Sequence, residues 1–192
     1  MRARDDAPAS PPLPLPVGRS DATVTVNDPA LASAASTYQR LVTAPFSLET
    51  PSSDVSTGIH ALVENVRRAS AIAVELAHTC EPVEAVAGPS QIAALVLHAD
   101  ALDFVASRIA SATLPVPLDV LAQTQDASPE IRAEIDRQFD QRIAEVLAPQ
   151  AGTVYCTAAR LYQAALALEP TQRRATTQLA AYGDAFIGSC TP

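Results

Sequence analysis

Proline divides this 192-residue chain into separate segments, and that division restricts the folds open to it. Five of the 16 prolines lie within the first 16 residues, and most of the others lie between segments with helical apolar periodicity. Proline starts or ends helices because its ring fixes φ and removes the backbone N–H. The chain also contains 38 Ala, the best helix former, against only 6 Gly and no Trp. We therefore expect an all-α fold with bundle-like packing of about five long helices plus one short helix.

The first 26 residues are expected to form a disordered or extended Pro-rich tail. The run from Pro11 to Pro16 favours polyproline II and has no apolar periodicity with which to join a core. Residues 27–192 are expected to form a single all-helical domain, because a chain of this length supplies one ordinary hydrophobic core.

Apolar residues at helical spacing predict where the helices of this domain lie. Asp28 and Ser128, each followed by proline, are predicted N-caps. Segment 90–113 is apolar over most of its circumference, with Leu95, Leu102 and Ile109 at seven-residue spacing, so we place it at the centre. The predicted segments are 28–43, 54–79, 90–113, a short 118–125, 128–147, and a final hairpin of 153–168 and 171–187.

The charge balance excludes several classes of partner. The formal net charge is −8, so the chain lacks the general attraction to phosphate on which nucleic-acid binding depends. The most apolar long window, 92–110, contains four ionisable groups, so we expect no transmembrane segment. The N-terminus has no apolar run typical of a signal peptide. The expected location is cytoplasmic by default, or periplasmic or secreted if a leader is missing from this chain.

Two pairs of side chains have the spacing of metal ligands. Glu75 and His78 form the E-x-x-H element that ferritin-like di-iron bundles use, but no second copy accompanies it. Gly58, His60 and Glu64 resemble the G-x-H-x-x-E signature of imelysin-like helical proteins, with the carboxylate one residue later, and this resemblance implies an iron site. His60 and His78 lie about 27 Å apart along a straight helix and cannot share one ion. We interpret both as solvated surface pairs, and we expect no metal or other cofactor.

The three cysteines form no C-x-x-C motif, so neither a zinc ribbon nor a thioredoxin-like redox centre is predicted. Cys80 completes an apolar helical stripe and is expected to pack in the core. Cys156 and Cys190 lie at the two ends of the predicted hairpin, which an antiparallel arrangement brings together. A disulfide between them is geometrically open, and its formation depends on the compartment.

Motifs for catalysis are missing from the sequence. It has no G-x-S-x-G element and no Gly-rich phosphate loop, so we do not expect an enzyme. We expect a non-catalytic structural or protein-interaction subunit, whose tail and charged helix around 128–148 contact a protein partner. The alternative is a periplasmic or secreted helical bundle that binds a small apolar ligand or a metal ion between its helices.

Overall fold

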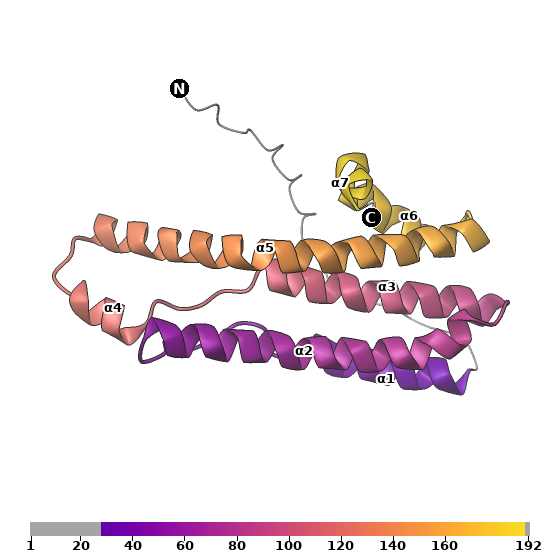
Figure 1. The fold of residues 1–192 in the computed structure, drawn as a ribbon, viewed down its shortest axis with the longest axis horizontal. Coiled ribbons are helices and arrows are strands. Elements are labelled where there is room, and N and C mark those ends of the chain that lie inside the picture. The colour runs from indigo at the N-terminus through magenta and orange to yellow at the C-terminus, as the bar shows by residue number, and fades with distance from the viewer. Residues whose placement is uncertain (1–27, 191–192) are drawn as a thin grey trace, which may run out of the picture.

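The computed structural model describes residues 28–190, which form seven helices and contain no strand (Figure 1). This confirms the predicted all-α, bundle-like fold. The predicted tail at 1–26 lies outside the described residues. The helices are α1 (Pro29–Val42), α2 (Val55–Glu84), α3 (Pro89–Ala110), α4 (Leu118–Gln123), α5 (Pro129–Leu168), α6 (Arg173–Tyr182) and α7 (Asp184–Ser189).

Helix α3 lies at the centre of the bundle, as predicted. It packs against α1 and α2 on one side and against α5 on the other, while α6 packs on α5 and α7 on α6 (Figure 1). Leu95 and Ile109 of the predicted stripe are buried, whereas Leu102 between them is only partly buried. The buried residues of α3 face several directions because neighbours surround the helix.

The predicted N-caps form the expected contacts. The side chain of Asp28 accepts a hydrogen bond from the backbone N–H of Ala30 at 2.9 Å. The hydroxyl oxygen of Ser128 accepts one from the N–H of Ile131 at 3.4 Å. Each contact satisfies one of the backbone donors that a helix start leaves without an intrahelical partner.

The predicted segments 128–147 and 153–168 are one helix, so the expected break near Pro149 was wrong. Proline inside a helix removes a hydrogen bond and costs about 3 kcal/mol. Leu147 and Ala151 on either side of Pro149 are buried in the core, and this packing offsets the local cost. The resulting helix of 40 residues is about 60 Å long. Among the described residues, no helix is both long and apolar enough to cross a membrane.

Helix α2 also runs past a proline, since it ends at Glu84 rather than at the predicted Thr79. Its last turn is held by tertiary contacts. Val83 is buried, and the Glu84 carboxylate lies 2.9 Å from Nδ1 of His98 on α3. The last predicted helix, in contrast, divides into α6 and α7 at Gly183, whose φ of +76° suits glycine but not a helix.

The segment that connects α3 to α4 lies against the start of α2. The N–H groups of Leu118 and Asp119 donate to the carbonyls of Ser52 and Ser53 at 2.9 and 3.2 Å. Gly58 is buried below this segment, and a Cβ atom there would lie 3.0 Å from Cδ1 of Leu114 and closer still to Ser52. The glycine of the proposed iron motif therefore permits close packing.

Candidate functional site

Two aspartates interrupt the apolar surface of α3. Asp100 and Asp103 lie three residues apart and are only 1% and 4% exposed. A buried carboxylate needs hydrogen-bond or cationic partners, because its transfer from water into the protein costs several kcal/mol. These partners come from two other helices, and with the aspartates they form what we call the polar cluster: Asp100, Asp103, Tyr162, Arg174, Gln178 and Tyr182.

Asp100 connects three helices through one oxygen atom. The hydroxyl of Tyr162 on α5 donates to Asp100 Oδ1, and Nε of Arg174 on α6 donates to the same atom at 2.9 Å. The side chain of Arg174 is 28% exposed, so the guanidinium reaches from the buried carboxylate to the surface. This ion pair holds the start of α6 against α3.

Asp103 contacts two side chains of α6. The Tyr182 hydroxyl donates to Asp103 Oδ1 at 2.6 Å, and the Gln178 amide nitrogen lies 3.3 Å from Oδ2. Burial raises the pKa of Asp103 to about 6, and the neighbouring charge of Asp100 acts in the same direction. The hydrogen bond from Tyr182 and the charge of Arg174 oppose this rise. Asp103 therefore gains or loses its charge near pH 6.

The amide of Gln178 fits the cluster best when it is rotated by half a turn. Its oxygen then accepts from both terminal nitrogens of Arg174, one of them at 2.9 Å. In this orientation the oxygen takes the position facing Asp103 Oδ2, where it can accept a hydrogen bond from the protonated carboxyl group. The rotated amide thus matches a neutral Asp103, in agreement with the raised pKa of this group.

The tyrosines of the cluster act as hydrogen-bond donors. Burial, together with the charge of nearby carboxylates, raises the pKa of both Tyr162 and Tyr182. Both hydroxyls therefore stay protonated and donate to Asp100 and Asp103. These hydrogen bonds, together with the ion pair of Arg174, connect α3 to α5 and α6.

The raised pKa of Asp103 predicts how stability depends on pH. A carboxyl group whose pKa is higher in the folded state stabilises the fold below its ordinary pKa, and this contribution is lost as the pH rises through 6. Relative to Asp103→Asn, the wild type should therefore gain about 1 kcal/mol of unfolding free energy when the pH falls from 7 to 5. Urea denaturation of both proteins at both pH values measures this gain. An unchanged difference between the two would contradict the prediction.

Beside the polar cluster, three aromatic rings pack edge to face. The ring centroids of Tyr155 and Tyr182 lie 5.5 Å apart, and that of Phe186 on α7 lies 6.1 and 5.9 Å from them. The structure joins Cys156 and Cys190 in a disulfide next to these rings, with Cα atoms 5.1 Å apart. The disulfide therefore links Cys190, the residue that follows α7, to the second half of α5.

The candidate metal ligands do not come together. His60 is exposed, and Glu64 forms its short contacts with Arg67, at 2.9 and 3.0 Å. Glu75 and His78 both lie on the surface, but their short contacts are with other residues. Glu75 forms an ion pair with Arg40 of α1, and Nδ1 of His78 lies 3.4 Å from the Glu81 carboxylate. Within residues 28–190, no three His, Cys, Asp or Glu side chains are grouped so that they could hold a metal ion.

Sequence analysis did not identify the polar cluster. The available signal was the pair of acids Asp100 and Asp103 on the most apolar helix, where a charge is costly unless it has partners. The identity of those partners could not be read from the sequence, since Tyr162 and Tyr182 follow Asp100 and Asp103 by 62 and 79 residues.

Cys80, the third cysteine, is buried as expected, and its burial raises the pKa of its thiol to about 12.

A second candidate site lies where α5 extends past the end of α3, at the left of Figure 1. We call residues 118–146 the arm; it comprises α4, the connection after it and the first half of α5. The structure describes every residue of the arm, and Ile143 alone among them is buried. Leu118, Ile131 and Val146 are more than half exposed. The arm therefore presents apolar side chains to solvent.

Four of these side chains form an apolar row on α5. Ile131, Ile135 and Phe139 follow one another at four-residue spacing, and Val146 continues the same face two turns later. Ile135 and Phe139 are half-buried, and Phe139 also touches the core. An open depression of about 450 Å³ lies beside the middle of the row, lined by Ile135, Gln138, Phe139, Gln141, Arg142 and Glu145.

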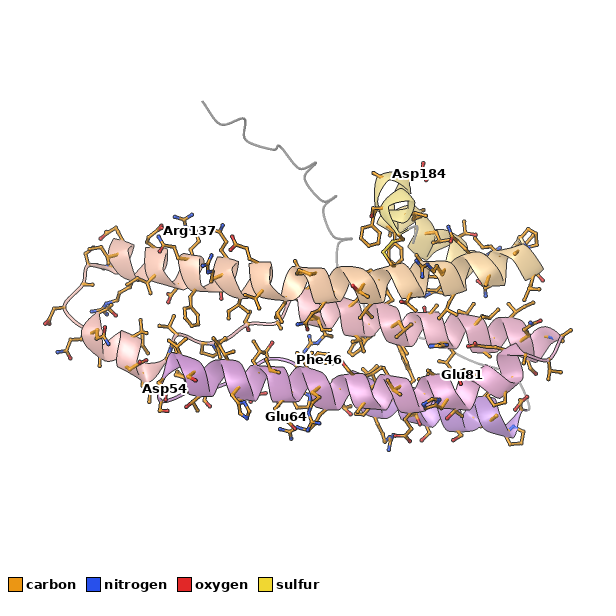
Figure 2. All side chains as sticks on the ribbon, in the orientation of Figure 1. Phe46, Asp54, Glu64, Glu81, Arg137 and Asp184 are labelled. Atoms are coloured by element: carbon orange, nitrogen blue, oxygen red, sulfur yellow. A yellow bond between two sulfur atoms is a disulfide. The ribbon has the colours of Figure 1, made fainter. Side chains whose placement is uncertain are left out.

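The arm is also acidic. It has seven acidic residues and three Arg, which gives −4, half of the net charge of the whole protein. Arg137 pairs with Glu134 and points away from α2 (Figure 2), and Arg142 pairs with Glu145 at 3.3 Å. Two of the three cations are thus neutralised within their own helix.

No protein-family model matches the chain, and neither a curated protein nor a solved structure matches it.

Proposed function

We propose that the protein is a non-catalytic interaction subunit that binds another protein through the arm. The observation that supports this most is the exposure of the apolar row on a helix that continues well past the end of α3. Apolar helix faces in soluble proteins are usually buried, and an exposed apolar patch with a polar rim is typical of a protein–protein contact.

A helical bundle that binds a small apolar ligand or a metal ion has less support. The large side chains at the centre of the bundle, such as Leu97, Tyr155 and Tyr162, are fully buried and fill the space between the helices. The depression beside the apolar row is open to solvent. A second open depression, of about 710 Å³, lies beside Arg174, between the starts of α3 and α6. Ligand sites usually enclose most of the ligand surface.

The disulfide supports a location in an oxidising compartment. Bonds such as that between Cys156 and Cys190 form and persist outside the cytoplasm, where glutathione and thioredoxin do not reduce them. We therefore propose that the interaction takes place in the periplasm or outside the cell, in contrast to the cytoplasmic location expected by default.

Site-specific photocrosslinking in the cells that produce the protein tests this function. A benzoylphenylalanine at Ile135 should form one discrete adduct, with a protein that mass spectrometry then identifies. The matched control places the same group at Val74, an apolar residue of α2 that is 55% exposed but lies outside the arm. No adduct at position 135, or the same set of adducts at both positions, would contradict the proposed function.

A further inference from the structure

We infer that the arm binds a cationic amphipathic helix, an inference that rests on the proposed function. Such a helix offers the two features that complement the arm, an apolar face and flanking positive charges. From Ile131 to Val146 the apolar row spans about 22 Å of helix, roughly the length of a partner helix of 15 residues.

The placement of two acidic residues supports a cationic partner. Asp136 and Asp140 each follow a residue of the apolar row by one position, so they lie about 100° around the helix from Ile135 and Phe139. Both are exposed, and neither has an ion-pair partner among residues 28–190. Like charges four residues apart destabilise a helix. Lysine or arginine side chains beside the apolar face of a partner would remove this repulsion.

The same charges argue against a second copy of this chain as the occupant. Two arms placed together would combine two segments of −4 each, and like-charge contacts oppose association. A helix with the opposite charge gains from the arm in two ways. The apolar row supplies the contact area, while the acidic residues increase the rate of encounter and select the partner.

A synthetic peptide serves as the probe for this inference. It has 18 residues, with Leu at positions i, i+3, i+4 and i+7 of the helix repeat and Lys elsewhere, and it carries a fluorescent label. A second peptide has the same composition in an order that gives no apolar face, and a third has Glu in place of Lys. Fluorescence anisotropy with the full-length protein should show binding of the first peptide and at least tenfold weaker binding of the other two.

Two double variants and their controls locate the binding site. Ile131→Ser with Ile135→Ser should weaken binding about tenfold, because it removes half of the apolar row. Its control, Val74→Ser with Val86→Ser, replaces two exposed apolar residues outside the arm and should have no effect. Circular dichroism verifies that each variant remains helical.

Asp136→Asn with Asp140→Asn should weaken binding several-fold and reduce its dependence on salt. Its control, Glu81→Gln with Asp184→Asn, removes two exposed acids that lie away from the arm, in the right half of Figure 2.

The results separate this inference from the proposed function. Binding of the cationic amphipathic peptide that both arm variants weaken and both controls preserve would support it. Equal binding of the scrambled peptide, or equal loss in arm and control variants, would indicate general attraction to an acidic protein and would overturn it. If the peptide does not bind but position 135 still forms a specific crosslink, the partner has a different chemistry and the interaction function stands. If both experiments fail, the proposed function is wrong as well.

Discussion

Replacing Arg174 with methionine is expected to lower the free energy of unfolding by about 3 kcal/mol. Arg174 is the cation that binds the buried carboxylate of Asp100, with Nε 2.9 Å from Oδ1. Removing one partner of a buried ion pair leaves an uncompensated charge, at a cost of about 3 to 5 kcal/mol. We expect the lower end of this range because the Arg174 side chain is partly exposed, so water can reach the site. Urea denaturation at pH 7 measures the effect.

Two further variants test whether the lost ion pair causes the loss of stability in Arg174→Met. Arg173→Met removes a neighbouring exposed guanidinium and should change stability by less than about 0.5 kcal/mol. Asp100→Asn in the Arg174→Met background removes the unpaired charge and should recover part of the loss. Equal losses for Arg173→Met and Arg174→Met would show that the ion pair does not stabilise α6.

Removing the disulfide is expected to have an effect of similar size. Cys156 and Cys190 are 34 positions apart, and closing a loop of this length stabilises a fold by about 4 kcal/mol in the chain-entropy model. The variant Cys156→Ser with Cys190→Ser should therefore unfold at a clearly lower temperature than the wild type. Addition of a reductant to the wild type should produce a similar decrease.

The third cysteine provides the control for this experiment. Cys80 is a buried free thiol, so Cys80→Ala should leave the response of the melting temperature to reductant unchanged. A wild type whose melting temperature does not respond to reductant would show that Cys156 and Cys190 are not joined in solution.

The helical fold could be predicted because its signals are local. Apolar periodicity and the caps at Asp28 and Ser128 depend on residues within a few turns, and the structure has helices at those places. The errors in the helix bounds occur near Pro82, Pro149 and Gly183, where local preference and tertiary packing interact. At Pro149, burial of residues on both sides outweighs the preference for a break. At Gly183, a positive φ ends α6, although the apolar pattern of the sequence continues past this residue.

The two candidate sites also differ in whether the residues that form them are close together in the sequence. The dense charge of the helix around 128–148 lies in one continuous segment and predicts a partner contact. Its apolar spacing predicts that Ile131 and Val146 face inward, but both are more than half exposed. The partner contact remains a proposal. The polar cluster could not be predicted, because its parts come from α3, α5 and α6 and meet only when these helices pack. The sequence shows its two acids, Asp100 and Asp103, as charges on an apolar helix, but it does not predict which side chains contact them.

The position of Asp100 and Asp103 also has a consequence for synthesis on the ribosome. Helix α3 emerges more than 50 residues before the side chains of Tyr162 and Arg174 that cover its acids. During that interval the surface that later meets α5 and α6 carries two hydrated carboxylates instead of an unbroken apolar face. Exposed apolar helices aggregate before their partners arrive, and charges on the contact face oppose this. The acids that are costly in the finished protein are therefore expected to oppose aggregation of its central helix while the chain is still growing.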